Sequence, residues 1–187
     1  MRLFVALEIT SSVRENLAAL IDNLRAVAPQ AKWARPENLH VTLKFIGEVP
    51  ETRLAAIRSA LAGARSDQPV ALDFRGLGFF PNEKHPRVFW AGIAASQNLK
   101  TLAADIDKAT EKLGIPREKR PFSPHLTLGR FEPPGLPEKV RGAIQGNAAR
   151  DFGSLCTNQF QLIESKLKPS GAEYTTVESF PFAAAEA

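Results

Sequence analysis

The tetrapeptide His40-Val41-Thr42-Leu43 recurs as His125-Leu126-Thr127-Leu128, at a sequence offset of 85. An apolar stretch has the same spacing, because Arg2-Leu3-Phe4-Val5-Ala6 is matched by Arg87-Val88-Phe89-Trp90-Ala91. Two unrelated landmarks that share one spacing indicate an internal duplication. Two copies of so long a unit do not make a solenoid array. They predict two similar lobes that share one core.

Strand and helix patterns follow each other in the same order in both copies. A Ser12-x-x-Glu15 capping box is expected to begin the first helix, which continues with apolar residues at helical spacing. The patterns predict strands at 2–8, 32–34, 39–46, 70–80, 87–91, 125–128, 156–166 and 175–182, and helices at 12–29, 51–64, 99–113 and after Pro137.

These elements predict an α+β fold in one bilobal domain that spans residues 1–187. Its approximate repeat units are 2–80 and 87–166, at an offset of 85. We expect two lobes related by a pseudo-twofold axis, each with a mainly antiparallel sheet and two helices. The active-site cleft would lie between them.

The composition is that of an ordinary folded protein, with 44% hydrophobic and 24% charged residues among 187. The net charge of +4 favours a weak, salt-dependent attraction of a polyanion, although many proteins with such a charge bind no nucleic acid. Cys156 is the single cysteine, so we expect neither an internal disulfide nor a cysteine-based zinc site.

The opening segment MRLFVALEIT has no small-residue cleavage site and soon reaches Glu8. We therefore interpret it as a strand and not as a signal peptide. No segment approaches the roughly 18 apolar residues that a membrane span needs. We expect a cytoplasmic monomer that has no membrane partner.

Each His-x-Thr motif is expected to carry two polar groups on one face of a strand. Because alternate residues of a strand share a face, His40 and Thr42 point the same way, about 6.5 Å apart. Val41 and Leu43 then face the core. The same alternation in the second copy predicts one cleft that holds two imidazoles and two hydroxyls.

Two histidines suit the opening of a cyclic phosphate, which needs one group to take a proton from water and another to protonate the leaving oxygen. Imidazole does both near neutral pH. The hydroxyls of Thr42 and Thr127 can donate hydrogen bonds to the phosphate oxygens. This chemistry requires no metal and no other cofactor. A single histidine in a strand is more often structural, but two of three histidines followed by x-Thr-Leu are hard to attribute to chance.

At this point the chain resembles a known family, the RNA 2′,3′-cyclic phosphodiesterases, once called 2′-5′ RNA ligases, of the two-histidine phosphoesterase superfamily. The resemblance extends over nearly the whole chain. Its residues are Arg2-Leu3-Phe4-Val5-Ala6-Leu7, Asn38-Leu39-His40-Val41-Thr42-Leu43-Lys44-Phe45-Ile46-Gly47, Pro86-Arg87-Val88-Phe89-Trp90, Arg120-Pro121-Phe122-Ser123-Pro124-His125-Leu126-Thr127-Leu128-Gly129-Arg130 and Glu164-Ser165-Lys166-Leu167.

The resemblance implies hydrolysis of an RNA-terminal 2′,3′-cyclic phosphate to a 2′-phosphate. It also implies roles that the symmetry of the motifs does not assign, with His40 as the proton donor to the leaving 3′ oxygen and His125 as the proton acceptor from water. In relatives, residues at the positions of Phe45 and Arg130 bracket the terminal base. Strand alternation argues against this role, because an offset of five turns a side chain away from the histidine unless the strand ends, twists or bulges.

Other polar and aromatic residues have weaker signals. Lys44 shares the parity of His40 and is a candidate phosphate contact. His85 lies in a polar loop and is expected to be exposed, and Trp33 and Trp90 suit either the core or the wall of the cleft.

Two alternatives stay open at this point. One is a related enzyme that acts on other cyclic or 2′,5′-linked nucleotides, including reversible 2′-5′ ligation. The other is a catalytically silent RNA-binding module, for which we expect a missing histidine or threonine. All four are present.

Overall fold

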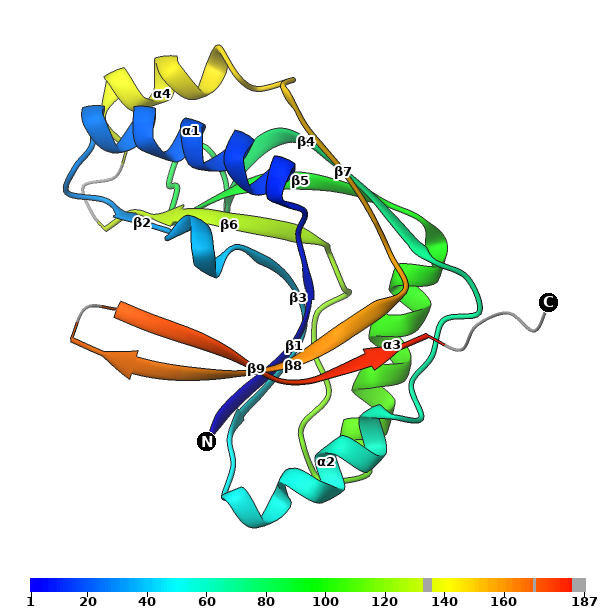
Figure 1. Ribbon diagram of the computed structural model, residues 1–187. Coiled ribbons are helices and arrows are strands. Elements are labelled where there is room, and N and C mark those ends of the chain that lie inside the picture. Colours follow the sequence, from blue (N-terminus) through cyan, green and yellow to red (C-terminus); the bar gives the residue numbers. More distant parts are fainter. Residues whose placement is uncertain (133–135, 170, 183–187) are drawn as a thin grey trace.

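Two antiparallel sheets form the frame of the computed structural model, which describes residues 1–132, 136–169 and 171–182 (Figure 1). The first sheet has the strand order β3-β1-β8-β9, and the second has the order β2-β6-β5-β4-β7. The strands are β1 (Arg2–Glu8), β2 (Lys32–Trp33), β3 (His40–Glu48), β4 (Val70–Phe80), β5 (Val88–Ala95), β6 (His125–Arg130), β7 (Asp151–Thr157), β8 (Gln159–Lys168) and β9 (Gly171–Pro181).

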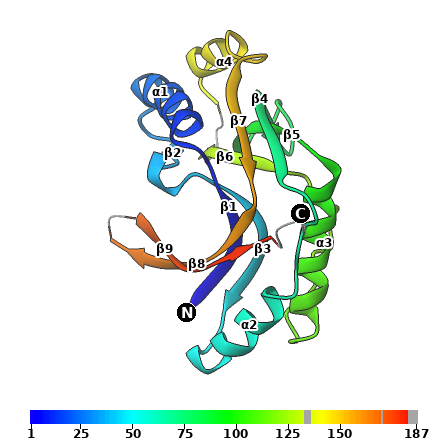
Figure 2. The same cartoon turned by 45° about the vertical axis from the view of Figure 1, so that its right-hand side comes forward.

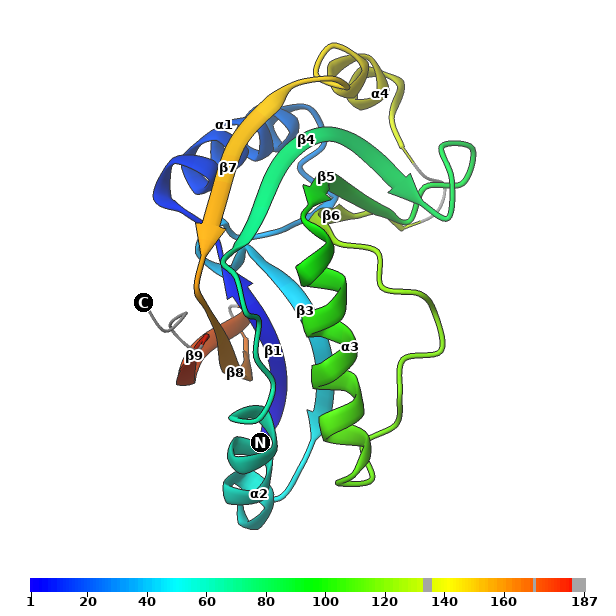
Figure 3. The same cartoon turned by 90° about the vertical axis from the view of Figure 1, so that its right-hand side faces the viewer.

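Helices pack on both sheets. The helices are α1 (Ser11–Val27), α2 (Leu54–Leu61), α3 (Gln97–Glu111) and α4 (Glu138–Gln145), with short 3₁₀ turns at Pro36–Asn38 and Glu51–Arg53. Helix α1 contacts β7 and α4 beside the second sheet, whereas α3 contacts β3 of the first sheet and α2 (Figures 1 and 3). The α+β bilobal fold expected from the sequence is confirmed. In the described part of the chain, none of the helices has the length and apolarity to cross a membrane.

The apolar stripes of the helices explain this packing. In α1, the stripe at helical spacing is fully buried except at its last member, Val27, which is 40% exposed. In α3, Leu99, Leu102 and Ile106 are buried in the same way. Each stripe removes apolar surface from water against a sheet, and this burial is the main force that holds helix and sheet together.

Segments of the two repeat units expected from the sequence are exchanged between the sheets. β4 comes from the first unit but pairs with β5 and β7, and β8 comes from the second unit but pairs with β1 (Figure 2). Each sheet therefore contains chain from both units. This exchange makes the lobes interdependent, because neither unit could complete a sheet alone.

The register of the paired strands also corrects the expected match between the two apolar stretches. Ala6 lies opposite Thr42, and Trp90 lies opposite Thr127. Trp90 thus stands where Ala6 does, at an offset of 84, whereas the motifs have an offset of 85. The expected match of Arg2–Ala6 with Arg87–Ala91 is wrong by one position, because a continuously apolar run such as Leu3–Leu7 has no alternation that would fix its register.

Two local expectations are also wrong. Thr10 caps α1, and its Oγ1 accepts a hydrogen bond from the backbone N–H of Val13 at 3.4 Å; Ser12 lies inside the helix. The strand expected at 156–166 begins instead at Gln159, because a break at Asn158 separates β7 from β8.

Candidate active site

The two motifs begin their strands and alternate as expected. Val41 and Leu43 are buried in β3, and Leu126 and Leu128 are buried in β6. The histidines and threonines between them are partly exposed: His40, Thr42, His125 and Thr127. Strands β3 and β6 contact each other although they belong to different sheets. Each motif is thus a rigid apolar strand that presents one imidazole and one hydroxyl.

A bulge follows each motif at the same place. In β3, Thr42 and Lys44 lie opposite the adjacent residues Ala6 and Val5, so Leu43 has no partner of its own. In β6, Thr127 and Gly129 lie opposite Trp90 and Phe89, and Leu128 is the unpaired residue. An extra residue in a strand reverses the alternation after it.

The bulges bring the fifth residue after each histidine back to the face of that histidine. Phe45 lies opposite Phe4, two residues from the partner of Thr42, and Arg130 lies opposite Val88, two residues from the partner of Thr127. Phe45 is 62% exposed, so it is not a core residue. The objection from strand alternation is therefore removed for both residues.

One cavity of about 1590 Å³ is lined by all six residues singled out from the sequence. These are His40, Thr42, Phe45, His125, Thr127 and Arg130. The cavity extends beyond these side chains, and its other charged lining residues are mostly basic: Arg25, Lys32, Arg35, Lys44, Arg87, Lys100, Arg117 and Arg120, against Asp107 and Glu118. It can therefore hold an anionic ligand that is larger than a phosphate group.

His40 lies between two aromatic rings. Its imidazole stacks on Phe4, with centroids 4.7 Å apart, and meets the edge of Tyr174 at 5.1 Å. Burial lowers the pKa of His40 from 6.5 to about 4; a backbone hydrogen bond at Asn38 acts against this, and the positive charge of Arg14 adds to it. His40 is therefore neutral in the unliganded protein at neutral pH.

His125 has a different environment. Its Nδ1 lies 2.8 Å from the carbonyl oxygen of Ser123, a distance that fits donation from a protonated Nδ1. This bond would leave Nε2 as the atom that exchanges protons. The ring also meets Phe80 edge-on at 5.0 Å and lies 6.5 Å from Trp90.

Lys44 lines the same cavity, but its ammonium group is not free to contact a phosphate, which corrects the expectation from strand parity. The bulge at Leu43 turns its side chain to the core side, where it is 1% exposed and bonded to Asp107. As expected, His85 is exposed. Trp33 lines the cavity.

Sequence reasoning missed the aromatic residues that enclose the histidines. Phe4, Phe80 and Tyr174 come from β1, β4 and β9, far from the motifs in the chain. Only strand pairing brings them beside the imidazoles. Phe4 could have been found from the sequence. If the strand expected at 2–8 pairs with the motif strand, an aromatic ring on it can reach the face that carries His40.

Comparisons with known proteins found a family match and several similar proteins. The family model for LigT-like phosphoesterases matches residues 7–90 and again residues 92–174, once in each half of the chain. The RNA 2′,3′-cyclic phosphodiesterase of Archaeoglobus fulgidus is 38% identical over 180 residues, which cover 96% of this chain and 99% of the relative. The protein of the same name from Methanothermobacter thermautotrophicus is 33% identical over 180 residues, covering 96% and 97%.

Solved structures have the same fold. TT0787 of Thermus thermophilus superposes with a TM-score of 0.78 at 34% identity, covering 97% of this chain and 98% of that one. E. coli LigT complexed with 3′-AMP superposes with a TM-score of 0.75 at 26% identity, covering 98% of both chains. The chain belongs to the LigT-like phosphoesterase family.

Proposed function

We propose that the protein hydrolyses RNA-terminal 2′,3′-cyclic phosphates to 2′-phosphates by paired histidine acid–base catalysis, without a metal. The observation that carries the proposal is the repeated motif itself. Two His-x-Thr strands, each followed by the same bulge, face one cavity lined with basic residues. The names of the relatives from A. fulgidus and M. thermautotrophicus support this substrate class.

In the proposed reaction, His125 Nε2 takes a proton from the attacking water. Water then bonds to phosphorus as the bond to the 3′ oxygen breaks, and His40 gives its proton to that oxygen. Thr42 and Thr127 donate hydrogen bonds to the non-bridging phosphate oxygens. The order of donor and acceptor follows the family resemblance.

Because its pKa is low, His40 must first gain a proton before it can act as the proton donor. A group with a pKa of about 4 holds almost no proton at neutral pH. A negative charge within about 4–6 Å favours the charged form of a base. We therefore propose that the substrate phosphate itself raises the pKa of His40 and so loads it with the proton that it later donates.

The cavity is large enough for an RNA end that is longer than one nucleotide. Small-molecule sites usually measure roughly 300–1,000 Å³, and this cavity is about 1590 Å³. Phe45 and Arg130 would stack on either face of the terminal base, which gives affinity without sequence preference. The remaining basic lining suits further phosphates of an RNA strand. We also propose that residues 1–187 act as one bilobal domain, as a monomer in the cytoplasm.

The test uses an oligoribonucleotide with a 2′,3′-cyclic phosphate end and purified protein in EDTA. The proposal expects turnover and a terminal 2′-phosphate, identified by chromatography against 2′- and 3′-phosphate standards. A 3′-phosphate would reject the proposed direction of opening. No turnover, or turnover that appears only with added metal, would reject the mechanism.

A further inference from the structure

Lys44 is a buried charge on the motif strand that the proposed reaction does not use. Its Nζ donates to Asp107 Oδ1 at 2.6 Å and to the carbonyl oxygen of Pro116 at 2.6 Å. The carboxylate of Glu118 lies 4.0 Å away. One ammonium group therefore connects β3 both to α3 and to the chain that follows α3.

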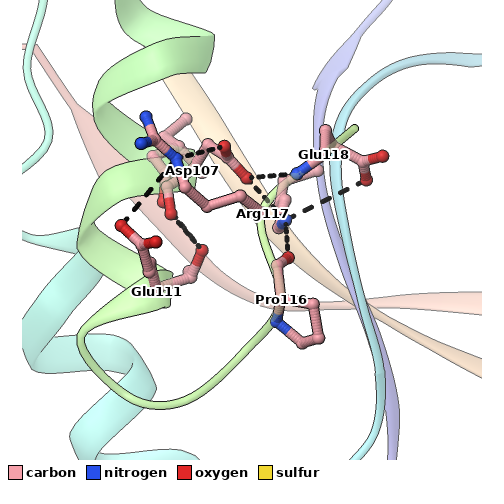
Figure 4. A network of polar contacts seen from close by, with 8 residues as sticks. Asp107, Glu111, Pro116, Arg117 and Glu118 are labelled. Atoms are coloured by element: carbon pink, nitrogen blue, oxygen red, sulfur yellow. Dashed lines mark hydrogen bonds and ion pairs between the residues drawn. The ribbon is translucent and has the colours of Figure 1, made fainter. Parts of the chain in front are cut away.

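Asp107 is the centre of this network (Figure 4). Besides Lys44, its carboxylate accepts hydrogen bonds from Arg117 Nε at 3.3 Å and from the backbone N–H of Glu118 at 3.2 Å. Burial raises the pKa of Asp107, but the hydrogen bonds from Lys44 and from the Glu118 backbone outweigh burial and hold it below its usual value. Asp107 is thus an anion that binds two successive residues of one segment.

That segment leads directly to the second motif. Residues 116–124 contain neither helix nor strand and run back along α3 to the start of β6 (Figure 3). Arg120, Phe122 and Ser123 line the cavity, and the Ser123 carbonyl contacts His125 Nδ1. The Lys44–Asp107 pair anchors the beginning of the segment whose end orients His125.

The matching position of the other lobe has no charge. Gly129 follows the second motif as Lys44 follows the first, and a Cβ at Gly129 would lie 2.9 Å from Trp33 Cε3. The ring of Trp33 fills that space. The fold of a lobe therefore does not require an ion pair at this position, because packing by an apolar ring suffices in the second lobe.

We propose that Lys44 and Asp107 form a positioning pair that sets the place of His125 relative to His40. A buried ion pair is a weak source of stability, since apolar residues of similar volume often replace it without loss. It does fix the relative position of two segments. Lys44 lies four residues after His40 on β3, and its hydrogen bonds hold the start of the segment that leads to His125. This inference rests on the proposed function, in which both imidazoles must reach one phosphate together.

The main test compares kinetics in three variants. Lys44→Met/Asp107→Leu removes both charges at similar volume, Lys44→Met removes one, and Ile106→Val is the control that alters the packing of α3 outside the network. Because a displacement of about 1 Å can cost about 10²-fold in rate, we expect kcat of the folded double variant to fall at least about tenfold. KM should change by less than about threefold, and Ile106→Val should keep the wild-type kcat. A folded double variant with the wild-type kcat would overturn the inference.

A second measurement does not depend on turnover or on the double variant. Asp107→Asn keeps the shape of the side chain but loses its charge, so the backbone amide NMR signals of Lys119, Arg120, Phe122 and Ser123 should shift or broaden relative to wild type. Signals of β7 should not change. Unaltered signals at these four residues would overturn the link. A wild-type protein that fails to open the cyclic phosphate would instead reject the proposed function, and the NMR result would still decide whether the pair holds the segment.

Discussion

Folding stability should depend on pH through His40. In the folded protein burial lowers the pKa of His40 to about 4, whereas the ordinary value of 6.5 applies to the unfolded chain. The unfolded chain therefore binds a proton more readily than the folded protein does. The stability that the neutral imidazole contributes is present above about pH 6.5 and is lost as the pH falls towards about 4. At about 1.4 kcal/mol for each pKa unit, the loss is about 3 kcal/mol.

The variant His40→Gln isolates this effect, because glutamine does not titrate. Urea unfolding of both proteins at pH 4, 5, 6, 7 and 8 gives two curves of unfolding free energy against pH. Carboxyl groups such as Asp107 affect both curves in the same way, so the difference between the curves reports His40. We expect this difference to change by about 3 kcal/mol between pH 7 and pH 4, in the direction that weakens the wild type. Parallel curves would refute the account of a buried, neutral His40.

Three further predictions concern neighbouring residues. Tyr174→Ala exposes the edge of His40 to water, so its pKa should rise towards 6.5; an NMR titration of His40 that still ends near 4 would contradict the role of the aromatic enclosure. Phe45→Ala should raise KM for the oligoribonucleotide by about fivefold or more with a smaller change in kcat, because stacking contributes about 1–3 kcal/mol per base, and steady-state kinetics with an unchanged KM would remove Phe45 from the binding site. Gly129→Ala should lower the free energy of unfolding by about 1–3 kcal/mol because its Cβ meets the Trp33 ring, and equal stability in urea would contradict the close packing there.

The order of helices and strands could be predicted from the sequence because each has a clear apolar period. The run at Arg2–Glu8 and the stripe that begins at Val13 both lie where the pattern placed them. The break at Asn158 was not predicted from the apolar period, although three successive polar residues, Thr157-Asn158-Gln159, interrupt that period there. The exchange of β4 and β8 between sheets could not be predicted either, since periodicity says nothing about which strands pair.

Strand alternation predicted which side chains share a face of the site only as far as the bulge in each motif strand. His40 and Thr42 needed only that alternation, and they line the cavity. For Phe45 and Lys44, simple alternation predicted the wrong face of the strand. The bulge that turns these side chains depends on the pairing of β3 with β1, and the residues of the motif do not indicate it. The low pKa of His40 also depends on distant partners, with Phe4 and Tyr174 contributing from two other strands.

The central claim is that His40 and His125 act together on one cyclic phosphate, and single-turnover hydrolysis by His40→Ala, His125→Ala and the double variant tests it most directly. Each single variant should be at least about 10²-fold slower than wild type. The double variant should fall no more than about tenfold below the slower single variant, because groups that act as a unit are not additive. A near-wild-type rate in either single variant would contradict the claim, as would a double variant slowed by the full product of the two single effects.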